Sequence, residues 1–168
     1  MMPRYLSLMS AAGLVLGTGC SGPQGPTSAA RDTAVPIVRL RTEPYSFSYF
    51  SGMDAPARLV VRDALVWRAV WNQIFRSQSP VPELPVVDFS REMLVVVALG
   101  TRNSGGYSIL VDRATEAGGA LEFTIRSVSP GEACVVIAAL TQPVDIARLA
   151  RRDGPVRFRE HAEVFSCH

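Results

Sequence analysis

The chain has 168 residues, of which 48% are hydrophobic, and a formal net charge of +2. This length fits one domain with an extension, and it is sufficient to bury a core without a structural metal ion. All 17 basic residues are arginines, scattered among 15 carboxylates, and only Arg151 and Arg152 are adjacent. Because no basic stripe of the kind that binds nucleic acid is present, the sequence predicts no nucleic-acid partner.

The first 19 residues have the pattern of a signal peptide. Arg4 precedes an uncharged apolar run from Tyr5 to Leu16, and small residues and Cys20 follow that run. A run of about a dozen residues is shorter than the roughly 20 that a membrane-spanning helix needs. The segment resembles a bacterial lipobox, so we expect cleavage before Cys20 and acyl chains such as palmitate on that cysteine. An ordinary secretory signal with an incidental Cys20 is the alternative.

The residues after Cys20 indicate how the folded part is attached. Ser21 stands where an aspartate often marks inner-membrane retention, which favours an outer-membrane or surface address. Residues 20–34 are mostly Gly, Pro, Ser, Thr and Ala with almost nothing to bury, so we expect a flexible tether. A single domain is expected over residues 35–168.

The first half of this domain predicts short strands and one helix. VPIVRLR and YSFSYF are typical of short extended segments, and ARLVVRD predicts a strand that ends at Asp63. Asp63 can cap a helix near residues 63–76, in which Trp67, Val70, Trp71 and Ile74 form one apolar stripe. Three prolines between residues 80 and 85 prevent the helix from resuming.

The second half predicts strands throughout. REMLVVVALG predicts a buried strand, and YSILVDRA with ALEFTIRSV predicts a hairpin that turns at Gly118 and Gly119. CVVIAALTQPVDIARLA predicts a strand, an interruption at Pro143 and a second strand, and PVRFRE closes the domain. The expected fold is therefore mainly β in the α+β class, an antiparallel sheet or sandwich with one helix.

Two cysteines remain once Cys20 is assigned to lipid. Cys134 and Cys167 form an even pair in an oxidising compartment, which favours a disulfide closing a loop of 33 residues. Two reduced, buried thiols are the alternative.

Few side chains suit catalysis. His161 and His168 are the only histidines, and the sequence contains no CxxC, HExxH or GxSxG motif. We therefore predict no metal site and no cofactor. The catalytic pair that the sequence offers is a Cys134 nucleophile with His161 as its base.

GTRNSGGYSI, residues 100–109, is the most informative polar segment. Its asparagine and glycines adopt positive φ readily, which is typical of a hairpin turn. The functional alternative is an exposed recognition loop with an aromatic anchor, supported by the segment from Thr141 to Val144. The partner-binding residues expected there are Asn103, Ser104, Gly105, Gly106, Tyr107 and Gln142.

Five motifs follow one another between residues 57 and 160: the Trp67 and Trp71 pair, DFSREMLVVVALG, NSGGYSI, Ser129–Pro130 and LTQPVDI. In this order and spacing they resemble the PrcB family, specifically its C-terminal domain. The resemblance implies a lipoprotein or secreted accessory domain. The family takes its name from a protein that binds and stabilises a surface protease complex. No catalytic residues are implied.

A second, local resemblance concerns inhibitors. NSGGYSI is similar to the Asn-Pro-Thr-Thr-Gly-Tyr loop of chagasin-like inhibitors of cysteine proteases through Asn103, Gly106 and Tyr107. That family also has an Arg-Pro-aromatic loop, which this sequence lacks. Asp153, Gly154 and Pro155 are a poor substitute for it.

Three functional hypotheses follow. The first is a non-catalytic, lipid-anchored envelope protein that acts as a protein-binding accessory domain for a secreted protease. The second is a chagasin-like inhibitor of papain-type proteases, and the third is a hydrolase that uses Cys134 and His161.

Overall fold

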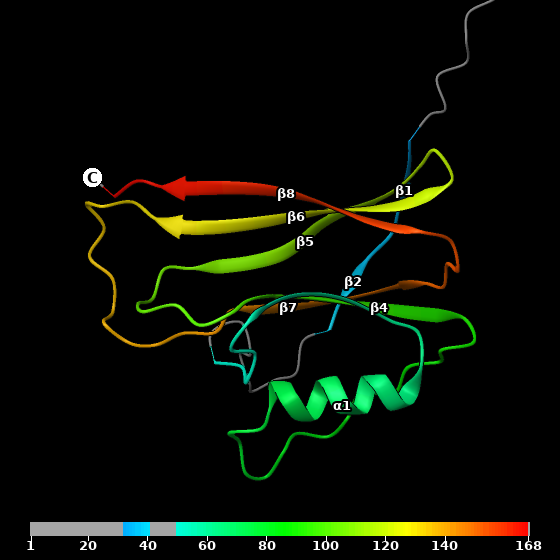
Figure 1. The fold of residues 1–168 in the computed structure, drawn as a ribbon, viewed down its shortest axis with the longest axis horizontal. Helices are drawn as coiled ribbons and strands as arrows, with labels where there is room; N and C mark the ends of the chain where they lie inside the picture. Colours follow the sequence, from blue (N-terminus) through cyan, green and yellow to red (C-terminus); the bar gives the residue numbers. More distant parts are fainter. Residues whose placement is uncertain (1–31, 41–49, 168) are drawn as a thin grey trace, which may run out of the picture.

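The computed structural model describes residues 32–40 and 50–167. Two four-stranded sheets face each other, and one helix lies against the far side of the second sheet (Figure 1). The mainly β, α+β fold predicted from the sequence is confirmed. Within the described ranges, no helix has both the length and the apolar character that crossing a bilayer requires.

Each sheet is built from segments that are distant in the chain. The first sheet has the order β1 (Thr33–Val35), β5 (Ser108–Ala117), β6 (Ala120–Pro130) and β8 (Val156–Phe165). The second has the order β2 (Val38–Arg39), β7 (Val144–Ala150), β4 (Glu92–Leu99) and β3 (Pro56–Val61). Helix α1 (Ala64–Ile74) connects β3 to the segment that leads into β4.

One strand pair differs from the predicted antiparallel pattern. β6 and β8 run parallel, whereas the other neighbouring strands are antiparallel. After β6 the chain leaves the first sheet, and β7, in the second sheet, returns it to the end where β6 began. β8 therefore re-enters the first sheet in the same direction as β6.

β4 lies at the centre of the molecule. Its odd-numbered residues face the first sheet and its even-numbered residues face α1, so that two cores meet on one strand. Residues Met93 to Ala98 are each 0% exposed. Burial on both faces explains why the sequence of β4 is a continuous apolar run instead of an alternating one.

Helix α1 is held at its start and along its buried face. The Asp63 carboxylate accepts a hydrogen bond from the backbone N–H three residues later, at 2.8 Å, as a capping residue does. Trp67 and Trp71 are buried against the second sheet. Their indole N–H groups donate to the carbonyl oxygens of Pro85 and Pro82 at 3.0 and 2.9 Å. The proline-rich segment that ends the helix therefore also packs against it.

A buried polar contact joins the two sheets. β5 has a bulge between Val111 and Arg113, where Asp112 has no partner in the register with β6. The Val111 N–H donates to Asp145 Oδ2 of β7 at 2.8 Å, and Arg39 Nη2 of β2 donates to the Val111 carbonyl at 2.7 Å. These bonds give the polar residues Asp145 and Arg39 a structural role.

The domain boundary differs slightly from the prediction. Thr33 and Ala34, assigned to the tether, pair with β5 as part of β1, so the folded part begins two residues before residue 35. Cys20, the rest of the tether up to residue 31, most of YSFSYF and His168 lie outside the described residues.

Candidate partner-binding site

Four segments meet at one end of the sandwich, on the left in Figure 1. They are residues 50–56, 100–107, 131–143 and 165–167, and together we term them the loop end. The Thr101 N–H donates to the Asp54 carbonyl, and the Gly131 N–H donates to the Phe165 carbonyl, both at 2.9 Å. Backbone hydrogen bonds therefore connect these segments, so that the loop end is one surface.

The two segments that the sequence predicts to act together lie side by side. Arg102 and Thr141 exchange backbone hydrogen bonds of 2.8 and 2.9 Å, and the Gly105 N–H donates to the Ile137 carbonyl at 2.9 Å. The buried Thr141 hydroxyl donates to the Ser104 carbonyl at 2.8 Å. Residues 101–107 are thus fastened to residues 137–142.

Both the backbone and the side chain of Gln142 form hydrogen bonds within this arrangement. Its backbone carbonyl accepts from the Ser51 hydroxyl at 2.8 Å. Its side-chain amide donates to Asp54 Oδ1 at 2.6 Å and to Thr101 Oγ1 at 3.3 Å. The amide therefore positions the loops around it, and this is a structural use of a residue predicted to contact a partner.

The two central glycines of the predicted recognition loop, Gly105 and Gly106, pack closely against another segment of the same chain. A Cβ on Gly105 would lie 2.6 Å from Ile137 Cγ1. Gly106 has φ +84°, and a Cβ there would lie 3.0 Å from Val136 Cγ1. Residues 131–143 occupy the space that larger side chains would fill, so these glycines permit close packing.

Tyr107 is half-buried, whereas the sequence predicts an exposed anchor. Its ring packs against the core between the sheets, and the Arg102 guanidinium carbon lies 5.6 Å from the ring centroid. A cavity of about 190 Å³ adjoins both side chains. Asn103, in contrast, is exposed. Truncation of Tyr107 is therefore expected to affect stability as well as any binding.

The segment from Cys134 to Leu140 is a loop, and the predicted strand there is wrong. Val135 is 100% exposed, Ile137 64% and Leu140 67%, and Phe50 on the neighbouring segment is 59% exposed. The loop itself forms no ladder: the Gly105 N–H donates to the Ile137 carbonyl, and the isolated bridges lie just after the loop, at Thr141 and Gln142. Sequence reasoning missed these side chains because an apolar run was interpreted as buried. Pro143, which cannot donate a hydrogen bond to a strand ladder, was the signal in the sequence that pairing is interrupted nearby.

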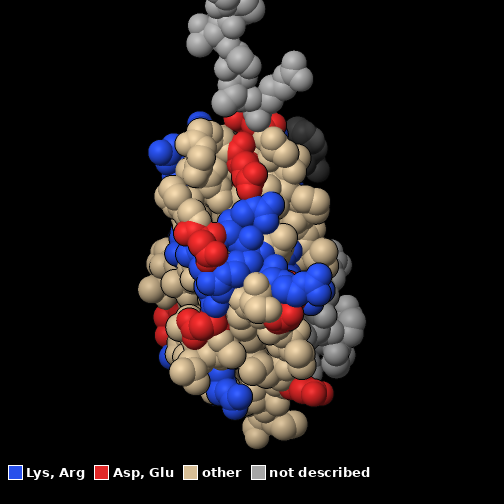
Figure 2. Space-filling view, turned by 90° about the vertical axis from the view of Figure 1, so that its right-hand side faces the viewer, with Lys and Arg blue, Asp and Glu red and all other residues tan. Residues whose placement is uncertain are grey.

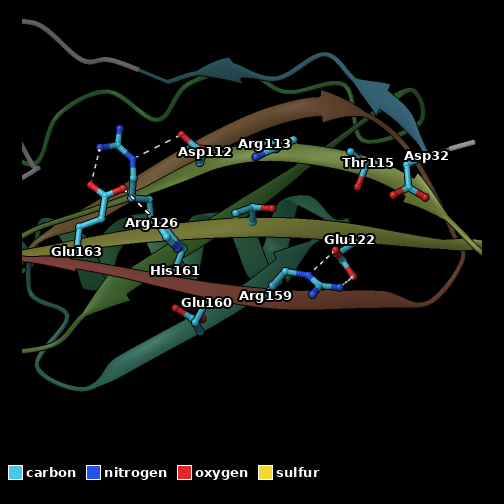
Figure 3. A pocket seen from close by; sticks show the side chains of 11 residues that line it. Asp32, Asp112, Arg113, Thr115, Glu122, Arg126, Arg159, Glu160, His161 and Glu163 are labelled. Carbon is cyan, nitrogen blue, oxygen red and sulfur yellow. Dashed lines mark hydrogen bonds and ion pairs between the residues drawn. The ribbon is translucent and has the colours of Figure 1, made fainter.

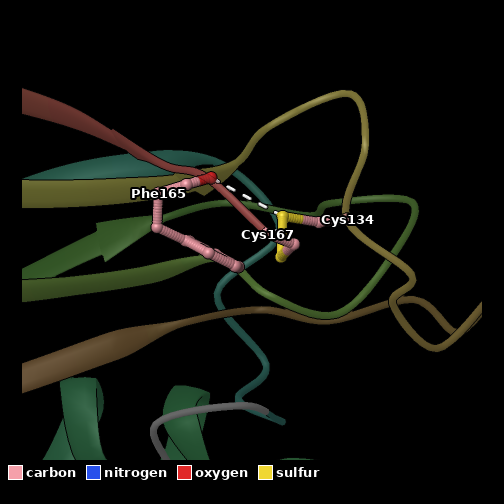
Figure 4. Close-up of a disulfide and its surroundings, with 3 residues drawn as sticks. All are labelled: Cys134, Phe165 and Cys167. Carbon is pink, nitrogen blue, oxygen red and sulfur yellow. Dashed lines mark hydrogen bonds between the residues drawn. A yellow bond between two sulfur atoms is a disulfide. The ribbon is translucent and has the colours of Figure 1, made fainter.

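A disulfide secures this apolar loop (Figure 4). It joins Cys134 to Cys167, with the Cα atoms 5.0 Å apart, and the Cys134 sulfur lies 3.6 Å from the Phe165 carbonyl oxygen. The loop is therefore covalently linked to the end of β8. A disulfide sulfur has no thiol proton and cannot serve as the nucleophile of a Cys134 and His161 pair.

The outer face of the first sheet carries a polar groove of about 590 Å³ (Figure 3). Arg126 lies 3.6 Å from Asp112 and 3.5 Å from Glu163, and Arg159 donates to both Glu122 oxygens at 2.8 and 3.1 Å. The hydrogen bond from Arg159 lowers the pKa of Glu122. Because these charges neutralise one another, the groove has the character of a solvated sheet face.

Arginines also gather at the end of the sandwich opposite the loop end (Figure 2). Arg62 donates to the carbonyls of Arg152 and Gly154, and Arg151 donates to the carbonyl of Phe89. The Arg152 guanidinium is paired with a glutamate of β5. These guanidinium groups tie loops together, which is a structural explanation for the basic patch.

The same end carries residues 153–155, the substitute for the second loop of a chagasin-like inhibitor. They lie between β7 and β8, whereas residues 103–107 lie between β4 and β5. In the β4–β7 pair, Glu92 is opposite Ala150 and Ala98 is opposite Val144, so these connections are at opposite ends. The structure does not bring the two segments onto one inhibitory edge.

Comparison with known families selects between the two resemblances. Residues 93–150 match the PrcB C-terminal family. The PrcB resemblance is therefore confirmed over the segment from β4 to β7, and this matched segment contains residues 100–107 and 131–143 of the loop end. No curated protein and no solved structure matches the chain.

Proposed function

We propose that this chain is a non-catalytic accessory protein that binds a partner protein through the loop end. The PrcB C-terminal match is consistent with an accessory role in a protease complex. A secreted protease is accordingly the partner that we propose. The contact surface consists of the exposed apolar side chains Phe50, Val135, Ile137 and Leu140.

The observation that carries this proposal is the exposure of the apolar loop within the segment that matches the PrcB C-terminal family. Exposing aliphatic side chains to water costs free energy, and a group of such exposed side chains commonly marks a contact surface. Hydrogen bonds to residues 101–105 and the disulfide at Cys134 hold this loop before any partner arrives. A preorganised loop binds without a large ordering cost.

A photoreactive amino acid at position 137 tests the contact directly. The residue is introduced into the full chain in its native cells, and cross-linked proteins are identified by mass spectrometry. Position 86 is the matched control, because Val86 is 90% exposed but lies between α1 and β4. We expect one protease or protease-associated protein at position 137 and none at position 86.

The binding strength of charged variants then tests the apolar contact. Ile137→Asp should weaken binding of the identified partner by about tenfold or more, and Val86→Asp should leave it unchanged. Equal cross-linking at both positions, or equal binding by both variants, contradicts a specific contact at the loop end. Inhibition of papain that is lost in Tyr107→Ala would instead favour the inhibitor hypothesis.

The proposal includes a lipid anchor on Cys20 in the outer membrane. The signal-peptide pattern, the cysteine after it and Ser21 support this address. We expect the mature protein to partition into detergent and Cys20→Ser to remain in the aqueous phase. If both forms partition alike, the anchor is refuted while the loop-end contact is still testable.

A further inference from the structure

β8 is the longest edge strand of the described sheets. It has ten residues and pairs with β6 on one side, whereas the other edge strands, β1, β2 and β3, have three, two and six residues. Natural sheets usually keep their edges short, because a row of unpaired N–H and C=O groups is a template for another strand. β8 is not shortened in this way.

The backbone groups that β8 directs outward can be assigned. The carbonyls of Phe165 and Pro155 accept hydrogen bonds from Gly131 and Leu121, both at 2.9 Å, on the β6 side. Alternate residues of a strand point these groups to the same side, so the odd-numbered residues face β6. The even-numbered residues therefore face away from it: Val156, Phe158, Glu160, Ala162 and Val164.

The charges on the outer face of β8 are complementary to those of an antiparallel copy. Arg157 and Arg159 lie in its first half, Glu163 lies in its second half and His161 lies between them. Figure 3 shows the side chains of Arg159, His161 and Glu163. A two-fold axis at His161 places each Arg159, which also donates to Glu122 of its own chain, opposite Glu163 of the second copy, and opposite charges across strands stabilise pairing. On the inner face, an axis at Glu160 would instead place the two Glu160 carboxylates opposite each other.

The inner face is complementary in the same register. Val156 and Phe158 pack on the core, but Val164 on the same face is 67% exposed. The axis at His161 places Phe158 opposite Val164 of the second copy, which covers that exposed side chain. Glu160 would lie opposite Ala162, with its charge neutralised by two hydrogen bonds from Arg58 at 2.8 and 2.9 Å.

We propose that β8 pairs antiparallel with β8 of a second copy of this chain about an axis at His161. The pairing joins two four-stranded sheets into one sheet of eight strands. It uses the outward N–H and C=O groups of residues 158, 160, 162 and 164 from each copy. The loop end is not required for it, so this dimer is independent of the proposed partner protein.

Cross-linking at the axis tests the register. Residues on the axis form a non-hydrogen-bonded pair with Cα atoms about 4.5 Å apart, within the span of a disulfide. In the chain carrying Cys20→Ser, His161→Cys should therefore give a disulfide-linked dimer under mild oxidation. Arg157→Cys is the control, because its two copies would lie roughly 26 Å apart. Peptide mapping identifies the linked cysteines.

A proline substitution tests the backbone pairing. Ala162→Pro removes an outward N–H without removing a donor to β6, and proline is tolerated on sheet edges. In sedimentation at about 100 µM we expect the parent chain to dimerise and Ala162→Pro to remain monomeric with an unchanged circular dichroism spectrum. A monomeric parent chain, or equal cross-linking at positions 157 and 161, would overturn the proposal. If Ala162→Pro does not fold, the cysteine pair decides.

Discussion

β4 and the loop from Cys134 to Leu140 are both apolar runs in the sequence, yet they have opposite environments. Every residue of β4 from Met93 to Ala98 is 0% exposed, whereas Val135, Ile137 and Leu140 are mostly in water. β4 pairs with β3 and β7 and is covered by the first sheet and by α1. Among the described residues, the loop has no strand on either side and is held by the hydrogen bond from Gly105 to Ile137 and by the disulfide at Cys134.

The difference shows that apolar composition produces a strand only where neighbours exist for both its backbone and its side chains. β4 is flanked by strands that satisfy its N–H and C=O groups, and layers on both faces remove its side chains from water. The loop has a fixed position but no such layers. Its apolar side chains are therefore available to another protein.

Matched leucine truncations give the largest expected contrast. Leu94→Ala should lower the free energy of unfolding by about 3 to 5 kcal/mol, because it leaves a cavity between β4 and α1. Leu140→Ala should change it by less than about 0.5 kcal/mol, because that side chain is exposed. Urea unfolding of both variants measures the difference. Similar losses would show that the loop is buried in solution.

Removal of the disulfide should have the next largest effect. Cys134→Ser with Cys167→Ser opens a loop of 33 residues, which should lower the free energy of unfolding by about 2 to 4 kcal/mol. Hydrogen exchange should also accelerate at Gly105 and Thr141, whose N–H groups bond across to the neighbouring loop. Unchanged exchange there would mean that hydrogen bonds alone hold the loop.

Tyr107 is half-buried, in contrast to the fully buried β4 and the exposed loop. Its truncation should therefore have an intermediate effect on stability. Tyr107→Ala should cost about 1 to 2 kcal/mol, because its half-buried ring contacts the core and Arg102. Asn103→Ala, at an exposed position of the same loop, should change stability by less than about 0.5 kcal/mol. A Tyr107→Ala variant as stable as Asn103→Ala would indicate an exposed ring.

The smallest effect concerns a paired charge on the solvated sheet face. The hydrogen bond from Arg159 lowers the pKa of Glu122 below its ordinary value of 4.5. The pair therefore stabilises the fold fully above that value, and this contribution is lost as the pH falls through the lowered pKa. The stability difference between the parent chain and Glu122→Gln should shrink from about pH 7 to about pH 3. A difference independent of pH would contradict the pairing.

The sequence alone was sufficient for the elements whose signals are local. The Asp63 cap, the stripe that contains Trp67 and Trp71, and the turn at Gly118 and Gly119 depend on residues a few positions apart, and the structure contains each of them. The continuous apolar run REMLVVVALG also predicted the buried strand β4 correctly. The motif series pointed to the PrcB family, and the match over residues 93–150 confirms this resemblance.

Only the tertiary structure decided what depends on distant neighbours. The parallel pairing of β8 with β6 follows from β7 joining the other sheet, and the exposure of Val135 and Ile137 follows from the lack of a covering layer. The glycines at 105 and 106 also acquired a packing role that their turn propensity does not reveal. A local pattern reports what a segment can bury, whereas the layers folded around it determine whether burial occurs.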